Sequence, residues 1–161
     1  MRPWLSAVLL SAALLTGCAP YTFNPSGKSE IKSLAIERFE NDTDQYELTD
    51  RMTDVVIDAF LSDGNLKVLP RDNADAILTG TLKNYTRAPA DYDENDEVIS
   101  YSVKMTFDIA LRKRGADSDM WEQLMTQEGI YTVATQTEQD AQNEAISLLV
   151  QDIINKTTKS W

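Results

Sequence analysis

The chain has 161 residues, with 15 lysines and arginines against 26 aspartates and glutamates, for a net charge of −11. This length fits one domain, and the acidic balance argues against nucleic-acid binding, which needs clustered cations. The chain has no histidine and a single cysteine, which excludes a histidine-based triad, a Cys–His dyad and a cysteine-rich zinc site within one chain.

The first residues have the pattern of a secretory signal peptide. One cation, Arg2, precedes an apolar run over residues 4–15 (WLSAVLLSAALL). The run is shorter than the roughly 20 residues that cross a bilayer, and such a run is typical of a secretory signal peptide. We therefore predict a signal peptide over residues 1–17.

The signal ends at a sequence that resembles the lipobox of bacterial lipoproteins, Leu15-Thr16-Gly17-Cys18. In that family the cysteine is acylated (with palmitate, for example) and the chain is cut before it, so the resemblance implies a covalent lipid on Cys18 and no other cofactor. Each buried methylene contributes about 0.8 kcal/mol to anchoring. Ala19, rather than an aspartate, follows the cysteine, which by resemblance to lipoprotein sorting implies the periplasmic face of the outer membrane. The alternative is a chance cysteine in an ordinary signal peptide.

The next segment is a tether. Residues 18–30 form the predicted lipidated N-terminus and its connection, rich in Pro, Gly, Asn and Ser. The remainder, residues 31–161, is predicted to be one domain.

That domain is predicted to begin with a strand over residues 31–39 and a helix over residues 45–62. A capping box formed by Asp44 and Glu47 would start the helix, and Asp63-Gly64 would end it. Short apolar runs then predict strands over residues 66–69 and 74–86, with a bulge or a close backbone approach at Gly80.

The clearest signal is a long alternation over residues 99–112, in which apolar and polar residues take turns. It predicts a long strand with one buried face. A polar connection over residues 87–97 would precede it, and a partner strand over residues 120–133 would follow, bulged near Gly129.

A second helix is predicted after a capping box at Thr137 and Asp140, running to about Lys156. The predicted order is β-α-β-β-β-β-α. It indicates an α+β fold: a two-layer α/β sandwich with two helices packed on one face of a mostly antiparallel sheet of about four to five strands.

The sequence offers little chemistry. The acidic segment 91–97 lacks the glycine at position 6 and the glutamate at position 12 of an EF-hand loop, and no spacing selects a pair of catalytic carboxylates. We therefore predict no metal site, no catalytic residues and no enzymatic activity.

The one basic run is Arg112-Lys113-Arg114, at the end of the long predicted strand. It is either edge protection or a cationic tip that meets anionic phosphates or an acidic partner loop. Lys83 and Arg87 are expected near the same end of the sheet.

Taken together, the pattern resembles the lipopolysaccharide-assembly lipoprotein family LptE. The resemblance rests on the lipobox followed by Tyr21-Thr22-Phe23, on residues 36–43 (IERFENDT), 57–64 (IDAFLSDG) and 74–80 (ADAILTG), and on the 92–101 hairpin. It implies a non-catalytic plug that sits in the LptD β-barrel, supports its assembly and helps deliver lipopolysaccharide to the outer leaflet. The alternative is a free lipoprotein that acts as a chaperone or envelope-maintenance factor.

Overall fold

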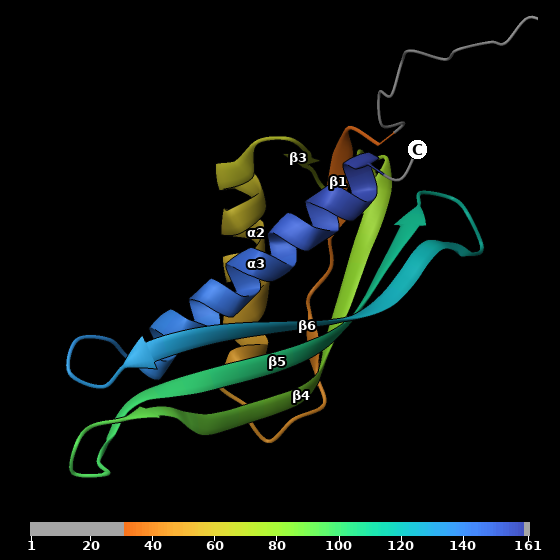
Figure 1. Ribbon diagram of the computed structural model, residues 1–161. Helices are drawn as coiled ribbons and strands as arrows, with labels where there is room; N and C mark the ends of the chain where they lie inside the picture. The colour runs from red at the N-terminus through yellow and green to blue at the C-terminus, as the bar shows by residue number, and fades with distance from the viewer. Residues whose placement is uncertain (1–30, 160–161) are drawn as a thin grey trace, which may run out of the picture.

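The computed structural model describes residues 31–159 as a mixed sheet with two helices on one of its faces (Figure 1). The elements in chain order are β1 (Ser33–Ile36), β2 (Glu40–Asn41), α2 (Leu48–Asp63), β3 (Lys67–Val68), β4 (Ala76–Tyr92), β5 (Val98–Lys113), β6 (Asp119–Thr132) and α3 (Glu138–Lys159). The predicted signal peptide and tether, Cys18 included, lie outside the described residues. Within residues 31–159, no helix is long and apolar enough to cross a bilayer.

The strand order is β3-β1-β4-β5-β6, with β2 also paired to β4. The long strands β4, β5 and β6 are antiparallel neighbours, whereas β1, β2 and β3 join the sheet through short parallel pairings. The α+β fold with a mostly antiparallel sheet is confirmed, and the structure adds a parallel margin made from the N-terminal strands.

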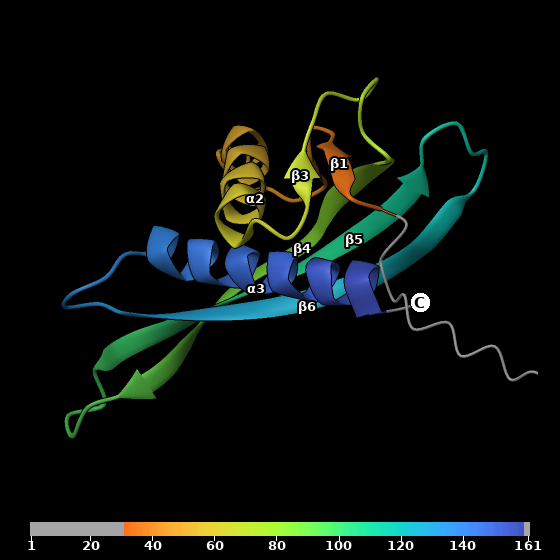
Figure 2. The ribbon, with the colours of Figure 1, turned by 90° about the horizontal axis from the view of Figure 1, so that it is seen from above.

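The alternation in β5 divides the sheet into two faces. Its odd-numbered residues from Val103 to Leu111 are fully buried, while the even-numbered residues between them are partly or fully exposed. The buried face is covered by Met52, Val56 and Phe60 of α2 and by Ile146 and Leu149 of α3, all in one core cluster. Both amphipathic helices are thus on the same side of the sheet (Figure 2).

Strand β4 is longer than predicted. Residues 87–92, expected to be a polar connection, pair with β5 from Arg87↔Val103 to Tyr92↔Val98. This arm projects beyond the helix layer (Figure 2), so both of its faces meet solvent and no apolar alternation marks it in the sequence. The turn depends on the Asp93 carboxylate, which accepts hydrogen bonds from the Asn95 and Glu97 amides at 2.8 and 2.9 Å.

One of the two predicted capping boxes is correct. At α3, the Asp140 carboxylate accepts hydrogen bonds from the amide and hydroxyl of Thr137, both 2.8 Å long. The box predicted at Asp44 and Glu47 is wrong, because α2 begins at Leu48 and Glu47 makes no side-chain cap. Asn41 organises that loop instead, since its side chain bonds the Thr43 amide at 2.9 Å and the Gln45 carbonyl at 2.8 Å.

Two glycines allow close packing. A Cβ on Gly80 would lie 2.2 Å from the buried ring of Phe39, and one on Gly129 would lie 2.0 Å from the carbonyl oxygen of Ala141 in α3. The predicted close approach at Gly80 is therefore correct. The predicted bulge near Gly129 is wrong, because the β5–β6 register is unbroken there; the glycine instead lets α3 touch the backbone of β6.

We predict that Gly129→Ala destabilises the fold by about 2 kcal/mol or more, because backbone cannot yield as a flexible side chain does. Urea unfolding followed by far-UV circular dichroism measures the change. The matched control is Gly115→Asn, since Gly115 has a φ of +79° and open space around it and asparagine tolerates that conformation. Equal stability of the Gly129 variant and the wild type would contradict the close approach.

Candidate functional site

The predicted basic run lies where β5 ends, and the partners of Arg112 and Arg114 lie close by. The Arg112 Nε atom is 2.8 Å from Asp119 Oδ1, and this hydrogen-bonded pair raises the pKa of Arg112. Arg114 donates its amide to the Asp75 carbonyl at 2.9 Å and its guanidinium to the Asp72 carbonyl. Lys113 is exposed.

The described chain also begins at this end of the sheet. Lys113 pairs with Ala76, and Ala76 pairs with Leu34 near the start of β1. The Asp75 carboxylate secures the entry, because one oxygen accepts hydrogen bonds from the Lys32 amide at 3.0 Å and the Ser33 hydroxyl at 2.9 Å. These bonds lower the pKa of Asp75. The basic run and the N-terminal entry of the domain are therefore neighbours.

Lys83 and Arg87 do not join the basic run, contrary to expectation. Arg87 is ten residues along β4 from Ile77, the residue paired with Arg112, which at about 3.3 Å per residue is about 33 Å. Lys83 instead forms an ion pair of 2.6 Å with Asp42. The length of β4 separates these cations.

Arg87 belongs to a cluster that sequence reasoning missed. Its guanidinium lies 3.6 Å above the ring centroid of Tyr101, which stacks on Tyr131, and its Nε donates to the Tyr131 hydroxyl at 2.7 Å. An ion pair of 3.2 Å with Glu138 ties the cluster to the start of α3. Only the register between β4, β5 and β6 brings these residues together, so the sequence alone gives no signal for it.

A chain of hydrogen bonds continues from this cluster into the helices. The Tyr85 hydroxyl donates to Glu138 and accepts from Gln142 at 2.9 Å, and Gln142 in turn accepts from Arg51 of α2. Burial, with the Glu138 hydrogen bond, raises the pKa of Tyr85. The phenol therefore stays protonated at neutral pH, where it serves as a hydrogen-bond donor and not as a base.

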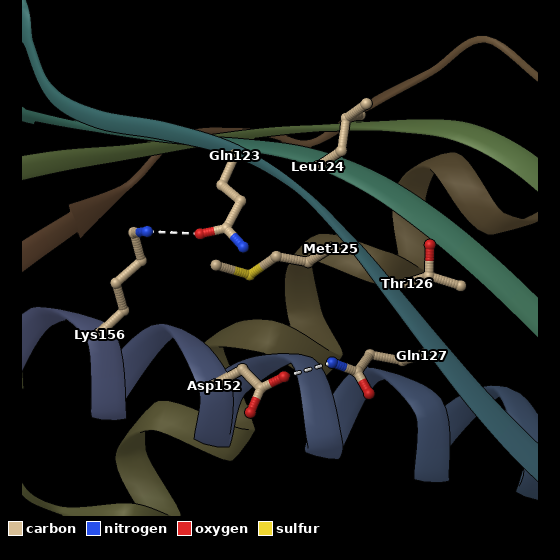
Figure 3. Close-up of a pocket in the computed structure, with 7 residues that line it drawn as sticks. All are labelled: Gln123, Leu124, Met125, Thr126, Gln127, Asp152 and Lys156. Carbon is tan, nitrogen blue, oxygen red and sulfur yellow. Dashed lines mark hydrogen bonds between the residues drawn. The ribbon is translucent and has the colours of Figure 1, made fainter.

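A shallow polar hollow lies between β6 and the second half of α3 (Figure 3). Its volume is about 330 Å³, and its lining is Gln123, Leu124, Met125, Thr126, Gln127, Asp152 and Lys156. Two hydrogen bonds cross it, from Lys156 to Gln123 and from Gln127 to Asp152, the second 2.6 Å long. Leu124 and Thr126 point to the opposite side of the strand (Figure 3).

None of these places has the composition of a metal centre. Within residues 31–159, no group of three or more His, Cys, Asp or Glu side chains is placed to hold a metal ion. The candidate functional features described so far are surfaces: the basic run at the end of β5, and the arm that β4 and β5 form at residues 87–98.

The model of the LptE family of lipopolysaccharide-assembly proteins matches residues 31–157. The chain belongs to this family. No curated protein matches the sequence.

Solved structures show the same fold at low identity. A candidate lipoprotein of Caulobacter crescentus is 14% identical with a TM-score of 0.55, over 84% of this chain and 96% of that one. A protein of Xanthomonas campestris is 12% identical with a TM-score of 0.55, over 85% and 90%. A hypothetical protein of Chlamydia trachomatis is 7% identical with a TM-score of 0.51, over 81% and 95%.

The Asp75 hydrogen bonds predict a pH dependence of stability. The pKa of Asp75 is lowered from its ordinary value of 3.8, so its contribution is complete above the unfolded-state pKa and is lost as the pH falls through the folded-state pKa. Asp75→Ala should cost about 1–2 kcal/mol at pH 7. The difference in unfolding free energy between Asp75→Ala and the wild type, measured by urea unfolding from pH 7 to pH 2.5, should shrink when the pH falls below about 4. A difference that does not depend on pH would contradict this role.

Proposed function

We propose that the protein is a non-catalytic lipoprotein that plugs an LptD-like outer-membrane β-barrel, supports assembly of that barrel and assists delivery of lipopolysaccharide to the outer leaflet. The observation that carries this proposal is the match to the lipopolysaccharide-assembly family over residues 31–157. The proposed partners are the barrel, lipopolysaccharide and the membrane that holds the lipid anchor.

The uncovered face of the sheet supports the plug role. Cross-strand pairs of polar side chains line it, including Ser102 with Glu128 and Thr106 with Thr126. The lumen of a large barrel is polar, and some barrels are closed by protein inside them. A surface of this kind remains hydrated or hydrogen-bonded inside such a lumen.

The entry of the chain supports the proposed anchor. Acylated Cys18 would be joined to Ile31 by a segment that spans at most about 45 Å when extended. Because Lys32 lies beside the basic run, through Asp75 and Arg114, the anchor would hold this end of the domain closer to the outer membrane than the opposite arm. The proposed location is the periplasmic side of that membrane.

The basic run is the proposed contact for lipopolysaccharide phosphates or acidic barrel loops. Arg112, Lys113 and Arg114 lie together at the anchored end, on a chain whose net charge is −11. All three side chains are exposed, so we expect each of them to be able to reach such a contact.

We predict that affinity purification of the tagged protein from detergent-solubilised outer membranes recovers a large β-barrel in near-equal amount. Cys18→Ser should abolish metabolic labelling with palmitate and lower the share of the protein in the membrane fraction, because serine has no sulfur to carry the lipid whose buried methylenes hold the protein in the bilayer. Depletion of the protein should reduce surface lipopolysaccharide.

The outcomes separate the candidate roles. Recovery of the wild-type protein without a barrel, with surface lipopolysaccharide unchanged on depletion, would replace the plug with a free envelope-maintenance factor. Cys18→Ser protein that remains acylated would overturn the anchor and leave the plug standing.

For the basic run, we predict that the double variant Lys113→Gln, Arg114→Gln lowers the lipopolysaccharide that co-purifies by about threefold to tenfold, the loss of two exposed charge contacts. Arg112 is left intact so that its pair with Asp119 still closes the hairpin. The control with the same change in charge is Lys83→Gln, Lys104→Gln, on other parts of the sheet. An equal loss in both double variants would assign the effect to overall charge.

A further inference from the structure

The outer margin of the sheet is β6, the last strand in the order β3-β1-β4-β5-β6. The backbone groups of its odd-numbered residues face β5. Val133, the residue directly after the strand, continues this pattern, because its amide donates to the Ile99 carbonyl at 3.0 Å. Because backbone groups alternate in direction along an antiparallel strand, and the register is unbroken from Trp121 to Thr132, the amides and carbonyls of the even-numbered residues point away from the sheet.

The last two of these outward amides are occupied by side chains of the chain itself. The Ile130 amide donates to the Glu144 carboxylate of α3 at 3.1 Å, and the Thr132 amide donates to the Gln136 side chain at 3.1 Å. These two contacts leave no free outward amide at the C-terminal end of β6 for a further strand.

The earlier outward amides have no such caps. From Glu122 to Glu128, the hydrogen bonds of the described residues include none from an even-numbered β6 amide to a loop, a helix or a side chain. This stretch, which we call the open edge (residues 122–128), lies beside the hollow of Figure 3. It presents four amides and four carbonyls in the spacing of a strand, which is a template for one more strand.

Apolar surface lies on both sides of the open edge. On the uncovered face of the sheet, Leu124 is 63% exposed. On the helix side, Leu148 is 37% exposed and lies in the helical row of Glu144 and Asp152, which both bond β6. An added strand would therefore find an apolar contact for each of its two faces.

The charges around the open edge select the partner. Asp108, Glu122 and Glu128 lie on the uncovered face, and Asp152 lies on the helix side. Among the described residues, the lysines near these four carboxylates are Lys104 beside Glu128, Lys156 in the hollow, and Lys83, which interacts with Asp108 but is also paired with Asp42. A second copy is disfavoured, since antiparallel pairing centred on the open edge would place Glu122 of each copy opposite Glu128 of the other.

We propose that the open edge binds an extended segment of another protein by strand addition, and that this segment carries lysine or arginine in alternation with apolar residues. Main-chain hydrogen bonds would supply the affinity, and the side chains at alternate positions would supply the selectivity. The inference is independent of the barrel, so co-purification of a barrel and occupation of this edge can each fail without the other.

The test uses the mature protein in detergent micelles and a synthetic peptide of about nine residues in which valine alternates with lysine. Amide exchange read by NMR should slow at least about tenfold at Leu124 and Thr126 when the peptide saturates the edge. A peptide of the same length that alternates valine with glutamate should leave these amides unchanged.

Proline at position 124 provides the matched variant. Leu124→Pro removes an outward amide that takes no part in the ladder, and proline is tolerated on edge strands, so we expect the fold to persist and peptide binding to fall at least about tenfold. Leu124→Val keeps the amide and should bind like wild type; Glu122→Pro repeats the test should Leu124→Pro fail to fold.

Peptide binding that survives both proline variants would overturn the proposal, as would an absence of added protection at Leu124 and Thr126. Slower exchange at the same amides on raising the protein concentration alone would overturn it in favour of a second copy.

Discussion

The structure depends on one constraint: the sheet has a single apolar face, and both helices are used to cover it. Five odd-numbered residues of β5 face the helices and are fully buried. At about 25 cal/mol per Å² of apolar area removed from water, this contact is the main favourable contribution to folding. It requires close approach, which is why α3 contacts the β6 backbone at Gly129.

With both helices on one face, every other surface is available to partners. The uncovered face of the sheet carries polar cross-strand pairs together with exposed Leu124 and Ile130. The arm of β4 and β5 extends past the helix layer (Figure 2), and residues 122–128 of β6 have outward backbone groups that make no hydrogen bond to a loop, a helix or a side chain of the described residues. The two ends of the sheet also differ in charge. The end where the chain enters holds Arg112, Lys113 and Arg114, and the opposite turn holds Asp91, Asp93, Glu94, Asp96 and Glu97. The proposed role uses these surfaces to contact partners.

The sequence predicts those parts of the fold in which one face of an element is buried. The alternation in β5 and the apolar stripes of both helices are visible because core contacts impose them, and the capping box of α3 is visible because its two residues are three apart. The arm at residues 87–92 is not visible, since solvent on both sides imposes no pattern. The parallel pairing of β1 with β4 is likewise decided by contacts distant in the chain.

The candidate site divides in the same way. The adjacent cations at residues 112–114 can be read from the sequence, but their partners Asp119 and Asp72 cannot. The sequence also does not show that Arg87 lies far from these cations, by about 33 Å at roughly 3.3 Å per residue. The Arg87 cluster joins three strands and a helix, so it exists only through register. The open edge is a property of strand order, which no local pattern encodes.

Hydrogen–deuterium exchange of the purified protein, alone and mixed with the proposed β-barrel partner, tests most directly whether the domain binds as a rigid body through its outer surfaces. The account predicts unchanged, slow exchange along the β5 core in both states, with new protection confined to outer surfaces such as the uncovered sheet face and the arm. Faster exchange in the β5 core on binding, or no new protection anywhere, would contradict it.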